Sequence, residues 1–307
     1  NSYRRADGVN PQILIYDNNW GIEIIAAIAR FGPGLPSNMI PFRVNQVSMI
    51  GLDFVLTAAA LGAERTIVLM PPSKVDELSS FESELHVANI IFEGLGYGSK
   101  RAVSLWEEDP DILSNILHKF GVLPGTPEGT FISTGRKRSI LRQSLNELHS
   151  KAPNPISEIT LPVGSPFGAI EVDVGGCTLC LACVGACPMG ALKDHPDKPS
   201  LSFMEDLCVQ CGLCKNSCPE KVITLKPRLN FLEVSQSYQV IKEEEPFEGI
   251  KCQKPFATKA TIEKMTNSLK NHAMFSEPGA IERLSMCDDC RIIDMATNDT
   301  NPLASGA

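Results

Sequence analysis

Apolar and polar positions along residues 11–151 follow the pattern of a parallel α/β sheet, in which short apolar runs alternate with longer amphipathic stretches. The runs of strand length are 13–16, 40–44, 66–70, 102–106 and 130–133. The stretches of helix length are 20–31, 52–61, 74–93, 110–119 and 137–149. We therefore predict one doubly wound α/β domain over residues 11–151, with short connections between its elements.

The predicted helices each have one apolar face and recognisable ends. The face of 74–93 repeats at i, i+3 and i+4, and its residues are Leu78, Phe81, Leu85, Ala88 and Phe92. The corresponding residues of 20–31 are Ile24, Ile28 and Phe31. Asp109 and Pro110 are a strong N-terminal signal for the helix 110–119, and the pair Pro71-Pro72 ends the third strand.

Outside this domain the pattern is less regular. Residues 1–10 are polar and predicted to be frayed, and 296–307 is predicted to be disordered. Residues 165–228 form a second domain with candidate strands at 169–174 and 222–225. The charged segment around residue 244 predicts a linker over 229–249, followed by a cysteine-containing tail over 250–295 with a helix near 258–270.

Composition narrows the possible functions. The chain has 307 residues, 43% of them hydrophobic, which is enough for two or more domains with sizeable cores. Its net charge of −8 argues against a nucleic-acid partner and is common among small electron carriers. No apolar run reaches the length of a membrane span. The first residue is Asn1 rather than Met, and no basic stretch followed by an apolar one indicates a secretion signal, so we expect either a longer polypeptide or processed ends.

Eight of the eleven cysteines lie in two runs of the form C-x2-C-x2-C-x3-C-P, which begin 31 positions apart. The cysteines of the first run are Cys177, Cys180, Cys183 and Cys187. Those of the second are Cys208, Cys211, Cys214 and Cys218. This run ligates 4Fe–4S clusters in two-cluster bacterial ferredoxins.

The spacing has a physical reason. Three thiolates at i, i+3 and i+6 on a tight loop can reach three corners of one cluster, and the fourth corner needs a remote thiolate. In ferredoxins of this type the fourth cysteine of each run ligates the other cluster. We therefore assign one cluster to Cys177, Cys180, Cys183 and Cys218. The second is assigned to Cys208, Cys211, Cys214 and Cys187.

Two other interpretations of these eight cysteines are disfavoured. Zinc knuckles also contain C-x2-C pairs, but they do not repeat a third and a fourth cysteine before proline. Disulfides are usually spread along a chain, whereas these cysteines are concentrated in one short segment. Eleven cysteines, most of them clustered, together with cluster ligation indicate a reducing cytoplasm.

Residues 169–225 resemble the bacterial two-cluster ferredoxins. The resemblance implies a small α+β fold in which strand–loop–helix–strand repeats surround two clusters, so the fold class of the whole chain is α/β plus α+β.

Three further cysteines lie in the tail. Cys287 and Cys290 have metal-knuckle spacing, Cys252 comes from another loop, and His272 is the obvious fourth ligand for zinc in a zinc-ribbon-like tail. Reduced structural cysteines are the alternative, and the two interpretations stay open. Zinc is favoured over a third cluster because neither the C-x2-C-x2-C spacing nor a trailing proline is present.

The N-terminal domain resembles the delta subunit of methyl-viologen-reducing hydrogenases. The resemblance is carried by Pro41–Val47, Gly51–Ala63 and Thr66–Met70. It implies an α/β scaffold in an electron-transfer setting, but that family holds a cluster through cysteines near these strand ends, and this stretch has none. The turn after the first strand, residues 17–20, also lacks the glycines of a dinucleotide-binding fold.

Nearly the whole chain resembles the proteobacterial iron–sulfur proteins encoded beside formate dehydrogenases. The residues that carry this resemblance are Gly176–Pro188, Cys208–Leu225, Glu243–Phe247, Lys254–Phe256 and Met286–Arg291. Members usually have a further ferredoxin-like segment upstream and a C-x2-C pair where this chain has Gly249 and Cys252. The resemblance implies redox partners such as a formate dehydrogenase.

These patterns predict an electron carrier that relays single electrons through two 4Fe–4S clusters and catalyses no reaction itself. No side-chain constellation for bond-making chemistry is recognisable in the sequence. Two alternatives stay open: an oxidoreductase whose α/β domain binds a flavin or nucleotide, and a redox-sensing or assembly protein.

Overall fold

The structure is a computed structural model that describes residues 3, 6–123, 126, 129, 134–196, 198–277 and 279–297. It divides into two compact units. The first is Asn1–Ser165 with Leu229–Phe231, and the second is Pro166–Arg228 with Leu232–Ala307.

The N-terminal unit is built around a four-stranded parallel sheet with the order β2-β1-β3-β4. The strands are β1 (Gln12–Asp17), β2 (Met39–Val44), β3 (Arg65–Leu69) and β4 (Ala102–Leu105). All five residues of β3 are buried, because β3 lies inside the sheet and is covered on both faces. A shorter strand, β5 (Glu158–Thr160), follows later in this unit.

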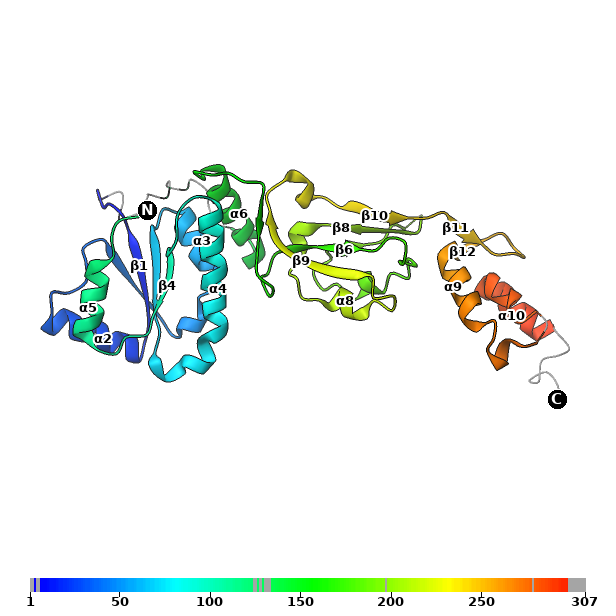
Figure 1. Ribbon diagram of the computed structural model, residues 1–307, viewed down its shortest axis with the longest axis horizontal. Helices are drawn as coiled ribbons and strands as arrows, with labels where there is room; N and C mark the ends of the chain where they lie inside the picture. The colour runs from blue at the N-terminus through cyan, green and yellow to red at the C-terminus, as the bar shows by residue number, and fades with distance from the viewer. Residues whose placement is uncertain are drawn as a thin grey trace. The chain divides into compact units, whose positions relative to one another are not determined.

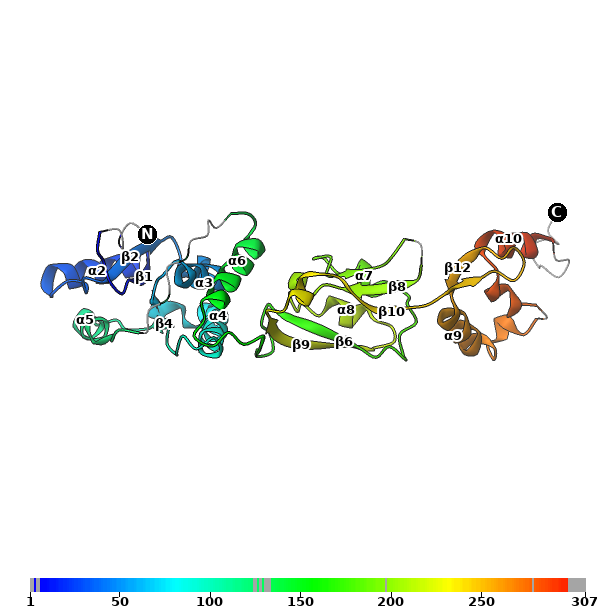
Figure 2. The ribbon, with the colours of Figure 1, turned by 90° about the horizontal axis from the view of Figure 1, so that it is seen from above.

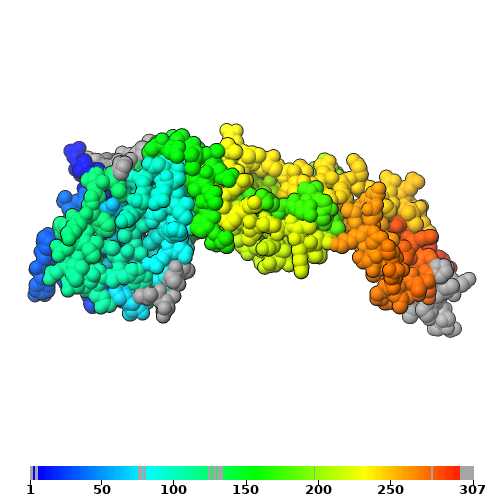
Figure 3. Space-filling model, viewed as in Figure 1, coloured from blue at the N-terminus to red at the C-terminus, as the bar shows by residue number. Residues whose placement is uncertain are grey.

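Helices cover this sheet, as Figures 1 and 2 show. They are α2 (Trp20–Phe31), α3 (Leu52–Ala60), α4 (Val75–Gly94), α5 (Pro110–Lys119) and α6 (Lys137–Ser150). Two short turns, η1 (Val47–Met49) and η2 (Pro72–Lys74), follow β2 and β3. In the space-filling view, α4 and the segment around α5 make up most of the visible face of this unit (Figure 3). The predicted α/β class is confirmed, whereas the predicted strand 130–133 lies outside the described residues.

The predicted helix faces are mostly confirmed. All five residues on the predicted face of α4 are buried, and the side chain of Asp109 accepts hydrogen bonds from the backbone N–H groups of Asp111 and Ile112 at the start of α5. The prediction for Phe31 is wrong, because its side chain is 79% exposed. Phe31 is the last residue of α2, and the Arg30 guanidinium lies 5.2 Å from its ring centroid.

Among the described residues, the second unit contains small antiparallel sheets, of which two lie around the cysteine runs and a third is the pair of strands at 246–248 and 255–258. In one, β6 (Gly168–Val172) pairs with β9 (Ile223–Asn230), which confirms the two strands predicted beside the cysteine runs. The other has the order β10-β8-β7, with β7 (Leu192–Lys193), β8 (Ser200–Phe203) and β10 (Gln239–Glu243). The short helices are α7 (Ala182–Gly185), α8 (Leu213–Ser217), η3 (Glu205–Leu207) and η4 (Glu233–Gln236).

The linker predicted over 229–249 is wrong for most of its length. Strand β10 in this charged stretch pairs with β8, and the Lys242 ammonium nitrogen lies 2.7 Å from the Glu244 carboxylate. The tail continues with β11 (Pro246–Glu248), β12 (Pro255–Thr258), α9 (Lys259–Leu269), η5 (Ala273–Phe275), η6 (Glu282–Ser285) and α10 (Asp288–Thr297). Among the described residues, no helix is long and apolar enough to span a bilayer.

Candidate metal centres

The two cysteine runs have the same backbone shape. A left-handed φ occurs two and four residues after the first cysteine and three residues after the fourth, at positions that are 31 apart. The pairs are Leu179 (54°) with Gln210 (56°), Leu181 (59°) with Gly212 (77°), and Gly190 (64°) with Lys221 (56°).

Left-handed backbone is unfavourable for residues with a side chain, and it persists where the surrounding structure demands it. Leu179 and Leu181 both adopt it within one run. Alternating backbone of this kind turns successive N–H groups toward one concave side, where they attract an anion. The loops are therefore shaped to surround a negatively charged group such as the sulfides of an iron–sulfur cluster.

Each run ends in the same turn. The N–H of Gly190 donates to the carbonyl of Cys187 (3.3 Å), and the N–H of Lys221 donates to the carbonyl of Cys218 (3.2 Å). A proline follows each of these cysteines and keeps it out of the helical region. The chain thus leaves each fourth cysteine in an equivalent direction.

In a cavity of the second unit, the fourth cysteine of the first run lies together with three cysteines of the second run. The cysteines that line it are Cys187, Cys208, Cys211 and Cys214. The apolar residues in its wall are Ile170, Ala191, Leu192, Phe203 and Leu225. These four thiols are the set that the sequence assigned to one cluster, and the apolar wall shields Cys208 from water while Cys211 stays exposed.

The segment after Cys218 returns to the first run. Antiparallel pairing of β6 with β9 places the N–H of Asp173 3.0 Å from the carbonyl of Val222. The hydroxyl of Thr178 donates to the carboxylate of Glu220 at 3.4 Å. Cys218 is therefore held beside the run that begins at Cys177, which is the arrangement needed for exchanged fourth ligands.

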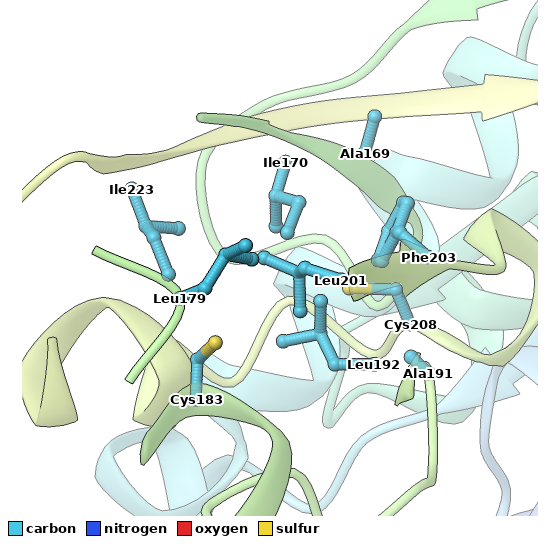
Figure 4. Packing of buried hydrophobic residues seen from close by; sticks show 10 residues of the cluster. All are labelled: Ala169, Ile170, Leu179, Cys183, Ala191, Leu192, Leu201, Phe203, Cys208 and Ile223. Carbon is cyan, nitrogen blue, oxygen red and sulfur yellow. The ribbon is translucent and has the colours of Figure 1, made fainter. Parts of the chain in front are cut away.

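Two of these eight thiols, those of Cys183 and Cys208, are buried. Figure 4 shows Cys183 and Cys208 at the two ends of a packed group that includes Leu179, Leu192 and Leu201. Burial raises the pKa of Cys183 and of Cys214 to about 11, and it raises the pKa of Cys208 as well. Burial thus favours the neutral thiols, whereas metal ligation requires the thiolates, so metal binding would release protons.

The tail holds a different kind of group. The sulfur atoms of Cys252, Cys287 and Cys290 all lie within 4.8 Å of one another, and Sγ of Cys252 is 3.3 Å from Sγ of Cys287. Among the residues described, this is the only trio of potential ligands so closely grouped. The hydrogen bond from the backbone N–H of Cys290 lowers the pKa of Cys287, whereas the hydrogen bond with Cys252 raises the pKa of Cys290 to about 11.

His272, predicted as a fourth ligand, is not part of this group. Its side chain is exposed, and its Nδ1 accepts a hydrogen bond from the N–H of Met274 at 3.3 Å. The imidazole therefore caps the short turn η5, which is a common role for a polar side chain at such a position.

The structure also places residues at the cysteine runs that the sequence pattern did not indicate. The Lys242 ammonium group, with a side chain only 10% exposed, donates to the carbonyls of Cys177 and Val174. The hydroxyls of Thr258 and Thr261 both donate to the carbonyl of Thr178, at 3.0 and 2.8 Å. These donors come from 65 to 83 residues away in sequence, so no local motif could have revealed them.

The second run has its own set of contacts. The side-chain amide of Gln210 donates to the carbonyl of Ala169 (2.8 Å) and lies 3.4 Å from Sγ of Cys208. Both guanidinium nitrogens Nε and Nη2 of Arg228 donate to Glu205 at 2.8 Å, in a two-point ion pair that holds the turn before Cys208. Arg-carboxylate pairs with this geometry are among the stronger polar contacts in proteins.

The N-terminal unit has a polar cavity of about 320 Å³ at the carboxyl ends of β1, β2 and β3. Its lining includes Asp17, Trp20, Asn45, Gln46 and Lys74. This edge is where open α/β sheets bind their ligands.

Two antiparallel strands that carry a pair of cysteine loops with one backbone shape define an iron–sulfur domain of the ferredoxin type. Comparison with known proteins gives the same result. Residues 176–237 match the 4Fe-4S dicluster domain family. An uncharacterized ferredoxin from Methanocaldococcus jannaschii is 31% identical over 61 residues, which are 19% of this chain and 97% of that protein. Through this segment the chain belongs to the dicluster ferredoxin family, and it has an iron–sulfur electron-transfer role.

Proposed function

We propose that the second unit binds two 4Fe–4S clusters with exchanged fourth ligands. One cluster is held by Cys177, Cys180, Cys183 and Cys218. The other is held by Cys208, Cys211, Cys214 and Cys187. The observation that carries this proposal is the cavity in which Cys187 lies with three cysteines of the other run. When bound, the clusters supply one-electron redox chemistry and no bond-making chemistry.

The burial pattern of the cysteines favours a relay between two partners. Cys180 and Cys211 occupy the same position in their runs and are both exposed, whereas Cys183 and Cys208 are buried. Each cluster therefore has one corner at the surface and another toward the apolar interior. Electrons enter at one exposed corner and leave at the other, and the apolar side chains between the loops limit contact with water.

We further propose that the chain is a carrier or a subunit of a larger oxidoreductase, with a formate dehydrogenase or a similar enzyme as partner. The N-terminal unit is then a docking scaffold. The eleven free cysteines favour a reducing compartment such as the cytoplasm. Purification of a tagged chain from anaerobic lysate tests the partner: we expect a molybdenum or tungsten dehydrogenase to be retained, and its absence contradicts this assignment.

The cluster proposal is tested by chemical analysis of protein prepared without air. We expect about eight iron atoms and about eight acid-labile sulfides per chain, and a reversible low-potential reduction of both clusters. Substantially fewer iron and sulfide, or loss of the clusters on a single reduction and reoxidation cycle, contradicts a two-cluster relay.

A second candidate function belongs to the N-terminal unit. The sheet order β2-β1-β3-β4 is that of a doubly wound sheet, which we propose for this unit, and the cavity lies where such sheets bind flavins or nucleotides. Its volume of about 320 Å³ is at the lower end for a ligand pocket. Flavin fluorescence released from acid-treated protein supports an enzyme with a flavin, and its absence favours the docking scaffold.

A further inference from the structure

The three thiols of the tail are gathered by two loops that are tied to each other. The N–H of Ile250 donates to the carbonyl of Ser285 at 3.1 Å, so the loop that carries Cys252 lies against the loop that carries Cys287. The ammonium group of Lys251 binds Asp294 in α10, which is the helix that begins just before Cys290. The sulfur atoms are thus brought together by contacts that do not involve them.

Within the first of these loops, the N–H of Gly249 donates to the carbonyl of Lys254 (3.0 Å) and the N–H of Gln253 donates to the carbonyl of Gly249 (2.8 Å). Gln253 has a left-handed φ of 58°. This tight turn presents Cys252 at its tip. A site whose ligand-bearing loops are shaped in this way loses little conformational entropy when an ion binds.

The spacing of the three sulfur atoms fits one ion. A zinc ion with four ligands at about 2.3 Å places neighbouring sulfur atoms about 3.8 Å apart. The Cys252–Cys287 separation is 3.3 Å, and all three sulfur atoms lie within 4.8 Å. In the part of the chain that the structure describes, no three of the eight cysteines in the two runs are grouped so closely. The tail therefore suits a single thiophilic cation, and the runs suit a larger polynuclear group.

Gly249 lies beside two of the three cysteines. A Cβ atom at this residue would lie 3.5 Å from Sγ of Cys252 and 3.3 Å from the backbone nitrogen of Cys287. Position 249 is three residues before Cys252, which is the spacing of a metal knuckle, but glycine brings no ligand. His272 is absent from the group of ligand atoms and caps η5 instead.

We propose that Cys252, Cys287 and Cys290 bind one Zn²⁺ ion and that its fourth position, on the side of Gly249, is taken by an exchangeable ligand from solvent. Structural zinc sites are usually closed by four protein ligands, whereas sites with three keep one position for water or another small ligand. The zinc ion carries no electron, because it has no accessible second oxidation state. This proposal is independent of the two clusters.

The test uses the full chain, purified without air, loaded with its iron–sulfur clusters and then given one equivalent of Zn²⁺. X-ray absorption at the zinc edge counts sulfur neighbours of zinc alone, so cluster iron does not interfere. We expect three sulfur atoms and one light atom in the native chain and in Gly249→Ala. We expect four sulfur atoms in Gly249→Cys, with release of zinc to a chelator slowed by about tenfold or more.

Two further variants complete the experiment. His272→Ala should leave both the zinc content and the light-atom neighbour unchanged, whereas Cys290→Ser should lose most of the zinc. The proposal is overturned if the native chain retains no zinc, if His272→Ala removes the light-atom neighbour, or if Gly249→Cys still shows three sulfur atoms. Because iron and sulfide are measured on the same samples, failure of the zinc site is distinguishable from failure of the cluster proposal.

Discussion

The two cysteine runs are alike in backbone and unlike in surroundings. Both use left-handed residues at the same three positions and end in the same turn. The first run is contacted by distant donors, namely Lys242, Thr258 and Thr261, which bind carbonyls around Cys177. The second carries a polar side chain of its own, Gln210. The backbone around the cysteines is thus alike in the two runs, whereas the polar groups that contact each run are different.

The largest effect is expected from removal of one fourth cysteine. In Cys218→Ala we expect loss of the cluster built on Cys177, Cys180 and Cys183, so that iron falls from about eight to about four per chain. Electron paramagnetic resonance of the reduced protein should retain the signal of a single cluster without the coupling between two. Cys187→Ala is the matched control and should remove the other cluster. If Cys218→Ala removes the cluster on Cys208 instead, the ligands are not exchanged.

The ion pair between Arg228 and Glu205 gives a smaller expected effect that is confined to the second run. Arg228→Met leaves the Glu205 carboxylate, whose side chain is 9% exposed, without its two-point partner. We expect a loss of about 1–3 kcal/mol in unfolding free energy, since the Arg228 side chain is partly exposed and the pair is only partly desolvated. Cluster loss on exposure to air should accelerate mainly at the second run.

A matched control is available for this variant. Lys226 pairs with Glu171 at 2.9 Å, but both side chains are about half exposed or more. Lys226→Met should therefore change the unfolding free energy by less than about 0.5 kcal/mol. Equal effects of the two substitutions, measured by chemical denaturation without air, would contradict a specific role for Arg228.

A charge change tests the surroundings of the first run. Removing the positive charge in Lys242→Gln should lower the reduction potential of the first cluster, because a nearby cation favours the more negative reduced state. The opposite charge of Glu244, 2.7 Å away, makes this effect modest. Potentiometric titration followed by electron paramagnetic resonance should show no shift at the second cluster. Lys198→Gln, in an exposed pair with Glu243, serves as control.

The smallest effect is expected from making the second run resemble the first at one position. Gln210→Leu places at this left-handed residue the side chain that the first run carries at Leu179, so the backbone should tolerate it. Loss of the amide beside Sγ of Cys208 should lower the potential of the second cluster slightly. The reciprocal variant Leu179→Gln should raise the potential of the first. Shifts in the opposite directions would show that this amide does not tune the cluster.

Much of the fold could be predicted from local patterns. Helix α2 was predicted with its observed bounds, and the buried face of α4 with all five residues, because the 3.6-residue period and a burial requirement leave few alternatives. Phe31 was predicted on the buried face of α2 but is exposed. The 3.6-residue period does not reveal which positions at the end of a helix are covered by other elements. Strand β10 was missed because its charges, read without their partners, indicated a linker.

From the sequence we could predict an iron–sulfur domain in the second unit, because cysteines at i, i+3 and i+6 on a short loop can reach three corners of one cluster and the run occurs twice. Tertiary structure alone decided which distant segments adjoin each run. It also brought Cys252, Cys287 and Cys290 together without His272, and it placed Gly249 beside Cys252 and Cys287. Cysteines a few residues apart constrain the loop that carries them. Contacts between segments tens of residues apart depend instead on how strands and turns pack, which the local sequence does not reveal.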